Sequence, residues 1–305
     1  MADILITTKI PQFLLDKITK LGYTFYVNNE IGPMNRDLLK ENIKKTKGII
    51  CTLGDTLDRD VLSNASSNLK VISTISAGYD HIDIESLKQR GVRLGYTPGI
   101  LTEATAEIAI SLVLMTSRKL LEANKILYNG DWKAWELFGF CGRQLSHSNV
   151  GIFGLGKIGK SIAEKMASFH PKNIFYTGSG RVKEDVFLAE FASGERFSAK
   201  FLEKKVFLRE CDVIIVSCSL NDETSGYFDK EIFKIMKDNC IFINISRGSV
   251  VNQVDLMEAL TSGKLFGAGL DVMTPEPIPT SDPLLKVANC NLLPHIGSAT
   301  NETRT

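Results

Sequence analysis

The sequence predicts an α/β protein with two lobes of parallel sheet, Rossmann-like or flavodoxin-like in their winding, and a cleft between them. Short apolar runs alternate with segments of helical periodicity in two successive units, which is typical of parallel strands joined by helices. A glycine-rich turn, GLGKIG at 154–159, follows one apolar run and precedes a helical pattern. The length of 305 residues also fits two domains better than one.

The first unit covers residues 1–100 and ends at Pro98 and Gly99. Apolar runs predict strands at 3–7, 23–27, 48–52, 71–74 and 92–97. Helical spacing predicts helices at 11–20, 35–44, 58–65 and 84–89.

The segment 101–121 joins the two units and is predicted as one long helix. It is apolar on nearly every face, which indicates burial between domains. The stretch NGDWKAWELFGFCGRQL that follows reads as a loop and holds both tryptophans, Trp132 and Trp135. Two interpretations are open: the rings pack against the body of the chain, or the stretch is an arm that reaches a neighbouring subunit. The arm and the apolar helix together favour a homodimer.

The second unit begins at the glycine-rich turn. Its predicted strands lie at 149–153, 173–177, 212–217, 240–245, 267–272 and 291–293, with helices after the turn and at 255–261. Residues 178–205 read as a polar, charge-rich connection. Two such units suggest two similar lobes, and ligands in these sheets bind beyond the carboxyl ends of the strands.

The turn itself predicts a dinucleotide site. Its first glycine permits the tight turn, the second lets the backbone approach a pyrophosphate, and the third lets the helix pack on the strand. The N-terminus of the helix then offers free N–H groups and partial positive charge to the phosphates. The residues assigned to this contact are Gly154, Leu155, Gly156, Lys157, Ile158 and Gly159.

Composition narrows the function further. Thirty-six basic and 35 acidic residues leave a formal charge of +1, which suggests neither a nucleic-acid partner nor a membrane surface. No apolar run approaches the length of a membrane span, and the first residues lack the layout of a signal peptide, so a cytoplasmic protein is expected. The six cysteines form no CxxC pair and are interpreted as reduced core residues, and no metal site is expected.

Three loops after predicted strands carry candidate chemistry: INISRGSVVN with Arg247, LDVMTPEPIP with Glu276, and LPHIGSAT with His295. Taken singly, these residues could be a surface ion-pair partner, a solvated turn residue and a structural histidine. Their placement after successive strands favours a joint site. A carboxylate that orients a histidine favours its protonated form, as a general acid requires, and an arginine fork matches the carboxylate of a 2-oxo acid.

Over essentially its whole length, the sequence resembles the D-isomer-specific 2-hydroxyacid dehydrogenase family. The resemblance rests on SRG, PEP and PHIGSAT downstream of GLGKIG. The segments ISTISAGYDHID and GLDVMTPEPIPTSDPLL are most similar to the glyoxylate/hydroxypyruvate reductase branch. It implies that His295 is the general acid, Glu276 its orienting partner and Arg247 the binder of the substrate carboxylate and carbonyl. It also implies substrate contacts from the amides of Ala77 and Gly78.

The resemblance assigns substrate binding to a first domain, 1–100, and cofactor binding to 101–296. Asp271 resembles the carboxylate near the nicotinamide amide, with a strand-end cap as the other interpretation. The remaining cofactor contacts that the resemblance implies are Ser219, Ile245 and Gly297. Residues 297–305 would complete the first domain, and this segment reads as truncated because the family normally continues through a helix here.

The strand at 173–177 bears on the choice of nicotinamide cofactor. NAD-binding proteins place a carboxylate at the end of this strand to accept a hydrogen bond from the ribose 2′-hydroxyl. Here Thr177 stands in that place, with Ser179 and Arg181 following, so NADP(H) is predicted over NAD(H). Glu184 and Asp185 lie only slightly further on.

The sequence therefore predicts NADPH-dependent reduction of small 2-oxo acids: glyoxylate to glycolate, and hydroxypyruvate to D-glycerate. Two alternatives stay open. One is a nucleotide-sensing binding protein like the carboxy-terminal-binding transcriptional corepressors, which resemble this family. The other is a different reductase of the family, such as one that acts on phosphoglycerate or formate.

Overall fold

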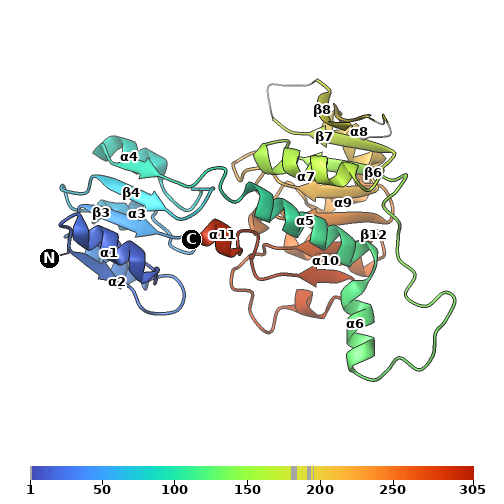
Figure 1. The fold of residues 1–305 in the computed structure, drawn as a ribbon, viewed down its shortest axis with the longest axis horizontal. Helices are drawn as coiled ribbons and strands as arrows, with labels where there is room; N and C mark the ends of the chain where they lie inside the picture. Colours follow the sequence, from blue (N-terminus) through green and yellow to red (C-terminus); the bar gives the residue numbers. More distant parts are fainter. Residues whose placement is uncertain (1, 180–183, 191–193, 195) are drawn as a thin grey trace. The chain divides into compact units, whose positions relative to one another are not determined.

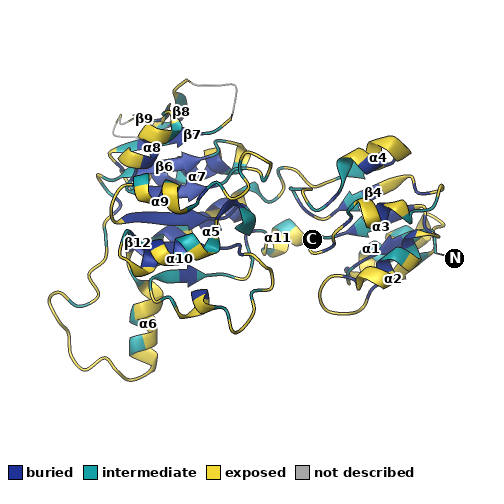
Figure 2. Cartoon of the chain, turned by 180° about the vertical axis from the view of Figure 1, so that it is seen from behind, coloured by how far each residue is buried: buried dark blue, intermediate teal, exposed yellow. Residues whose placement is uncertain are grey.

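The chain forms two compact units, Met1–Ile100 and Leu101–Thr305. The computed structural model describes residues 2–179, 184–190, 194 and 196–305. Each unit has its own sheet and its own buried core (Figures 1 and 2). Residues 297–305 group with the second unit, although the resemblance assigns them to the first.

The first unit is a five-stranded parallel sheet in the order β2-β1-β3-β4-β5. Each predicted strand and helix of this unit is present, with ends displaced by a few residues. The elements are β1 (Ile4–Ile6), α1 (Gln12–Lys20), β2 (Phe25–Val27), α2 (Arg36–Ile43), β3 (Gly48–Cys51), α3 (Arg59–Ser63), β4 (Val71–Thr74), α4 (Ile84–Arg90) and β5 (Arg93–Gly95).

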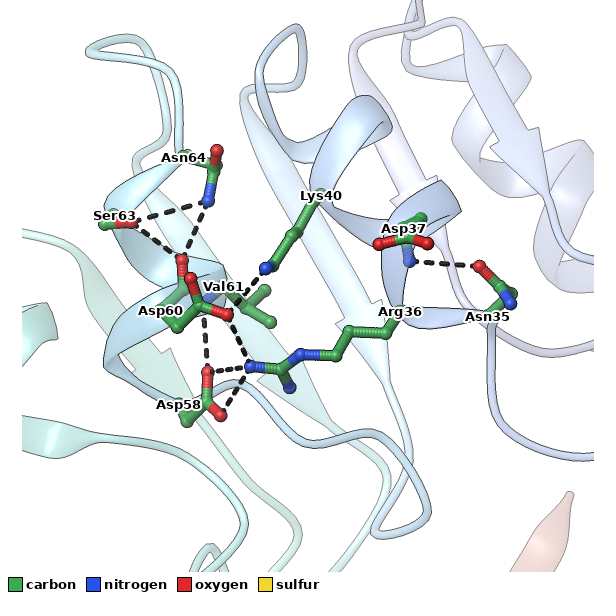
Figure 3. Close-up of polar contacts among 9 residues, drawn as sticks. All are labelled: Asn35, Arg36, Asp37, Lys40, Asp58, Asp60, Val61, Ser63 and Asn64. Carbon is green, nitrogen blue, oxygen red and sulfur yellow. Dashed lines mark hydrogen bonds and ion pairs between the residues drawn. The ribbon is translucent and has the colours of Figure 1, made fainter.

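Capping residues and ion pairs fix the starts of α2 and α3 (Figure 3). Asn35 and Asp58 cap the two helices by accepting hydrogen bonds from amides of the first turn. The Arg36 guanidinium joins the carboxylates of Asp58 and Asp60 at 2.7 and 2.8 Å, and Lys40 reaches Asp60 at 2.6 Å. Because these groups are largely exposed, the pairs define helix ends and add little stability.

The second unit is an eight-stranded sheet in the order β13-β12-β11-β10-β6-β7-β9-β8, parallel except for β8 against β9. Its strands are β6 (Asn149–Phe153), β7 (Asn173–Thr177), β8 (Val186–Glu190), β9 (Arg196–Phe201), β10 (Val213–Val216), β11 (Cys240–Asn244), β12 (Leu265–Leu270) and β13 (Cys290–Leu292). Its helices are α5 (Thr102–Ser117), α6 (Leu120–Tyr128), α7 (Lys157–Ala167), α8 (Lys204–Glu210), α9 (Lys230–Ile235), α10 (Gln253–Thr261) and α11 (Asn301–Arg304), with short 3-10 turns η1 (Gly248–Val250) and η2 (Pro283–Lys286).

Helices cover both faces of this sheet. Helices α5 and α7 pack on one face around a core that includes Leu112 and Ile162, whereas α8, α9 and α10 cover the other, around Phe207, Phe233 and Leu256 (Figures 1 and 2). Parallel strands covered on both faces are buried throughout, which explains the continuous apolar runs of β10 and β11.

The prediction of one long helix over 101–121 is wrong. The chain breaks at Lys119, whose φ of 52° is left-handed, and a second helix, α6, runs on to Tyr128. Helix α5 packs against α7 and against strands β11 to β13 of its own unit's sheet, and half of its residues are buried. No residue of α6 is buried. Apolar composition therefore marked α5 as an inner helix but did not distinguish the exposed helix that follows.

The interpretation of 178–205 as only a connection is also wrong, because β8, β9 and the start of α8 lie there. In β9, Phe197 and Ala199 are buried while Arg196 and Lys200 are exposed. This period of two was the available strand signal, and the many charged residues obscured it. Helix α9 was missed as well.

All six cysteines are free, as expected, but one is not in the core. Cys51, Cys211 and Cys240 are buried, Cys218 and Cys290 are half-buried, and Cys141 is exposed. Burial raises the pKa of the Cys51 thiol to about 12 and of Cys218 to about 11, so these thiols are protonated at neutral pH.

The described residues contain neither a membrane-spanning helix nor a cluster of metal-ligating side chains. No helix there combines the length and hydrophobicity that crossing a bilayer requires. Nor does that part of the chain hold a group of three or more His, Cys, Asp or Glu side chains arranged to bind a metal ion.

Candidate active site

The three loops predicted to carry chemistry follow three neighbouring strands. Strands β11, β12 and β13 lie side by side and parallel, so their carboxyl ends meet at one edge of the sheet. Arg247 follows β11, Glu276 follows β12 and His295 follows β13. Residues separated by up to 48 positions are thereby placed along one edge.

His295 and Glu276 are in direct contact. Nδ1 of the imidazole lies 2.7 Å from Oε2 of the carboxylate, and the two side chains are 24% and 29% exposed. His295 has a left-handed φ of 53°, and its amide donates to the Leu293 carbonyl in a tight turn. The contact occupies Nδ1 and leaves Nε2 as the ring nitrogen for a substrate.

The carboxylate of Glu276 is held from both sides. Oε1 accepts a hydrogen bond from the Met273 amide at 2.8 Å, and Oε2 faces His295. Burial by itself would raise the pKa of Glu276. The hydrogen bonds from His295 and Met273, with the positive charge of Arg247, outweigh burial and hold that pKa below its usual value. Glu276 is therefore ionised at neutral pH and places a negative charge beside the imidazole of His295.

Arg247 lies in a turn that Asn244 organises. The Asn244 side chain donates to the Arg247 carbonyl at 2.9 Å and accepts from the amide and the hydroxyl of Ser246. The Arg247 guanidinium donates to the Ser246 carbonyl at 2.9 Å through Nη1. Asn244 is 1% exposed and was not identified from the sequence, although its position as the last residue of a buried strand was a usable signal.

Asp271 anchors the loop that carries His295. It is 1% exposed, and its two carboxylate oxygens accept hydrogen bonds from the amides of Ile296 and Gly297, each at 2.8 Å. Burial raises the pKa of Asp271, while these two amide donors oppose that rise. The structure thus gives Asp271 a place in shaping the loop, and its contact with a nicotinamide amide stays a prediction.

The glycine-rich turn leaves no room for side chains at two positions. Gly154 has a φ of 101°, and a Cβ there would lie 2.8 Å from the backbone of Cys218. A Cβ on Gly159 would lie 2.1 Å from the Gly154 carbonyl oxygen. Gly156, which precedes α7, has nothing within 4 Å of such a Cβ. The turn therefore packs closely against the protein at Gly154 and Gly159 and is open at Gly156, at the N-terminus of α7. This arrangement fits the pyrophosphate of a dinucleotide.

Strand β7 ends at Thr177, as predicted, and this residue is 1% exposed. Among the described residues its hydroxyl has no hydrogen-bond partner. Beside it lies a hollow of about 530 Å³, whose lining includes Thr177, Ser179, Lys204 and Lys205. Arg181 lies outside the described residues. The sequence did not single out the two lysines, because their segment was read as a connection.

The other assigned cofactor residues occupy the same edge of the sheet or the segments that follow it. Ser219 is exposed after β10, and its carbonyl accepts from Thr224. Ile245 is buried directly after β11, and Gly297 is buried with its amide on Asp271. Their cofactor contacts stay predictions.

Ala77 and Gly78 lie in the first unit, in the turn after β4. The Gly78 carbonyl accepts a hydrogen bond from the Ser76 hydroxyl at 2.6 Å. His81, in the same turn region, has its Nε2 atom 3.0 Å from the Thr74 hydroxyl, which agrees with a structural role. The other two histidines, His147 and His170, are both exposed.

A parallel sheet with this glycine turn at its carboxyl edge defines the class of dinucleotide-binding α/β proteins. Comparison with known families narrows the class: the description "D-isomer specific 2-hydroxyacid dehydrogenase, NAD binding domain" matches residues 110–297. The chain belongs to the D-isomer specific 2-hydroxyacid dehydrogenase family. It is accordingly an enzyme of the dehydrogenase class that uses a nicotinamide cofactor.

Individual relatives support this family assignment. The chain is 47% identical over 276 residues to a protein of Mus musculus named glyoxylate reductase/hydroxypyruvate reductase, covering 90% of this chain and 82% of the relative. The Homo sapiens protein of that name is 45% identical, with 89% and 80% covered. Among solved structures, a protein from Thermus thermophilus superposes with a TM-score of 0.87 at 34% identity, covering 99% of this chain and 91% of its own. A glyoxylate reductase from Paecilomyes thermophila gives 0.84 at 27% identity, with 99% and 90% covered.

Proposed function

We propose that this enzyme reduces small 2-oxo acids, glyoxylate to glycolate and hydroxypyruvate to D-glycerate, with NADPH as the reductant. The observation that carries the proposal is the 2.7 Å contact between Nδ1 of His295 and Oε2 of Glu276. The contact lies on the same sheet edge as Arg247 and in the same unit as the glycine-rich turn. The names of the mouse and human relatives support the two substrates.

The proposed chemistry gives each side chain one task. When bound at the glycine-rich turn, the nicotinamide cofactor supplies a hydride to the carbonyl carbon. His295 donates the proton on Nε2 to the carbonyl oxygen, and Glu276 stabilises the imidazolium before that transfer. The Arg247 guanidinium binds the substrate carboxylate and polarises the carbonyl.

The first unit is proposed to complete the substrate site. Among the described residues, no acceptor takes the amide hydrogens of Ala77 and Gly78, which supports their use for the second carboxylate oxygen. This assigns substrate binding to 1–100, while the second unit binds the cofactor. Substitution of Gly78 by proline removes one of these donors and is expected to raise KM for glyoxylate with little change in the affinity for NADPH.

The preference for NADPH is supported by the end of β7. Thr177 provides no carboxylate to repel a 2′-phosphate, and Ser179 next to it is exposed. Arg181 stays a sequence prediction: Arg181→Ala is expected to weaken NADPH far more than NADH. Equal losses for both cofactors would remove Arg181 from the site.

A homodimer is proposed from the surface of the second unit. The exposed fractions of Trp132 and Trp135 are 55% and 76%, and that of Phe138 is 83%. These rings follow helix α6, which has no buried residue. Such exposed apolar surface favours the arm over packing against the chain's own body. Analytical ultracentrifugation at micromolar concentration is expected to show a dimer, and monomer alone would reject it. A cytoplasmic location stays a prediction from the sequence.

Oxidation of NADPH in the presence of glyoxylate, hydroxypyruvate and pyruvate, measured in parallel, tests the proposed activity. We expect turnover on the first two, with pyruvate reporting on how strictly the site selects substrates. Absence of turnover on every 2-oxo acid would contradict the proposal and favour a nucleotide-sensing role like that of the corepressors.

A further inference from the structure

The hollow beside Thr177 is lined by two lysine side chains that have no part in the proposed reaction. Lys204 and Lys205 open helix α8, and both line the hollow together with Thr177. We propose that these two lysines recognise the 2′-phosphate of the cofactor and so decide the choice between NADP(H) and NAD(H). The inference rests on the proposed function, which places NADPH on the glycine-rich turn.

Sheet topology places the lysines where the ribose would lie. Strands β7 and β9 are parallel neighbours, with Tyr176 opposite Phe201. The Leu202 amide continues the ladder by donating to the Tyr176 carbonyl at 3.0 Å. The chain after β9 therefore emerges beside the end of β7, and α8 begins shortly after Leu202. In dinucleotide-binding sheets the end of this strand contacts the adenosine ribose at its 2′ position.

The two ammonium groups are available for an anion. In the part of the chain that the structure describes, neither forms an ion pair with a carboxylate. Lys204 is half-buried, and its Nζ lies 5.0 Å from the centre of the Tyr227 ring, which limits its freedom. Lys205 is exposed. A phosphate dianion in the hollow would give both lysines a partner.

Two carboxylates, Glu203 and Glu223, line the same hollow and define the competing outcome. Either could accept a hydrogen bond from a free 2′-hydroxyl in place of the acid missing at Thr177, which would favour NAD(H). If the lysines bind the 2′-phosphate, the negative charge of Glu223 only repels it. Glu223→Gln should then tighten the binding of a nucleotide that carries the 2′-phosphate. Whether Glu223→Gln tightens or weakens nucleotide binding therefore distinguishes a site for the 2′-phosphate from a site for the 2′-hydroxyl.

Isothermal titration calorimetry with adenosine 2′,5′-bisphosphate and with 5′-AMP tests the inference directly. These nucleotides differ only in the 2′-phosphate, so the ratio of their Kd values reports its recognition. We expect the bisphosphate to bind at least about tenfold more tightly to the wild-type protein, as one charge-assisted contact provides. Lys204→Ala with Lys205→Ala should remove most of that advantage, leaving only what the predicted contact of Arg181 provides. The Kd of 5′-AMP should stay within about twofold, since these lysines are not expected to contact the rest of the nucleotide.

Two controls accompany the double variant. Lys172→Ala removes one positive charge, half of what the double variant removes, at the amino end of β7 and should change neither Kd. The arginine variants Lys204→Arg with Lys205→Arg should retain the preference, because both side chains keep their charge. Retained binding of 5′-AMP shows that each variant is folded.

The outcomes distinguish this inference from the proposed function. Wild-type preference for 5′-AMP would overturn both the lysine assignment and the NADPH preference. A preference for the bisphosphate that is undiminished in the double alanine variant, or equal losses for both nucleotides, would overturn the lysine assignment alone. Failure to reduce any 2-oxo acid would contradict the proposed activity and leave the nucleotide result standing.

Discussion

Replacing Glu276 by glutamine tests how the site prepares its acid. The side-chain shape is kept, and Oε1 can still accept the hydrogen bond from Met273 at 2.8 Å. At the Oε2 position, 2.7 Å from His295 in the wild-type protein, the variant presents an amide without charge. The substitution therefore removes one charge-assisted hydrogen bond and the carboxylate that favours imidazolium.

A hydrogen bond to a charged group contributes about 1.5–3 kcal/mol, and each 1.4 kcal/mol corresponds to about tenfold in a rate. We expect kcat/KM for hydroxypyruvate to fall by about 10- to 100-fold, because the lost contact stabilises the acid form that the transition state needs. The Kd of NADPH should not change. Steady-state NADPH oxidation and fluorescence titration of the cofactor measure the two quantities.

Glu258→Gln is the matched control. Glu258 forms an exposed ion pair with Lys230 at 2.7 Å on the outer surface of the same unit, so its loss should leave kcat/KM unchanged. If Glu276→Gln retains kcat/KM within about threefold of the wild-type value, the orienting role of Glu276 is refuted.

Three further predictions follow from the same geometry. Folding lowers the pKa of Glu276, so its contribution to stability is fully present above the ordinary value of 4.5 and is lost as the pH falls through the lower folded value. Urea titrations should show the stability advantage of wild type over Glu276→Gln shrinking as the pH falls below 4.5, and a difference that stays constant would contradict this. Gly159→Ala should lower the stability by about 1–3 kcal/mol, and with it Tm, and should also lower the affinity for NADPH, whereas Gly156→Ala should lower only the affinity. Calorimetry and cofactor titration measure the two quantities. An unchanged Tm for Gly159→Ala would contradict the tight contact between Gly159 and the Gly154 carbonyl. Arg247→Lys keeps the charge and loses the planar fork, so KM for glyoxylate should rise by about tenfold at constant NADPH affinity; an unchanged KM would remove Arg247 from the substrate site.

The sequence predicted most of the second unit's sheet because buried parallel strands appear as uninterrupted apolar runs, as in β10 and β11. Strands β8 and β9 lack that signal. Strand β9 alternates buried and exposed residues, and β8 is its antiparallel edge partner, so both were hidden in charged sequence. The break at Lys119 was missed because a single left-handed residue leaves no trace in hydrophobic periodicity.

The contacts of the candidate site were likewise predictable from the sequence only in part. The contact of His295 with Glu276 was predictable because the ends of neighbouring parallel strands share one edge. The hydrogen bonds of Asp271 to the amides at 296 and 297 were not, since backbone donors have no sequence signature. Lys204 and Lys205 escaped notice because their position beside Thr177 depends on the register of β9 against β7.

The central claim is that His295 supplies the proton in the reduction of a 2-oxo acid. It is tested most directly by NADPH oxidation with saturating hydroxypyruvate, measured for the wild-type protein and for His295→Ala. The account predicts turnover by the wild-type protein and a fall in kcat of at least about 100-fold in the variant, with NADPH bound equally well by both. A variant that binds NADPH and retains kcat within about threefold of the wild-type value would contradict it.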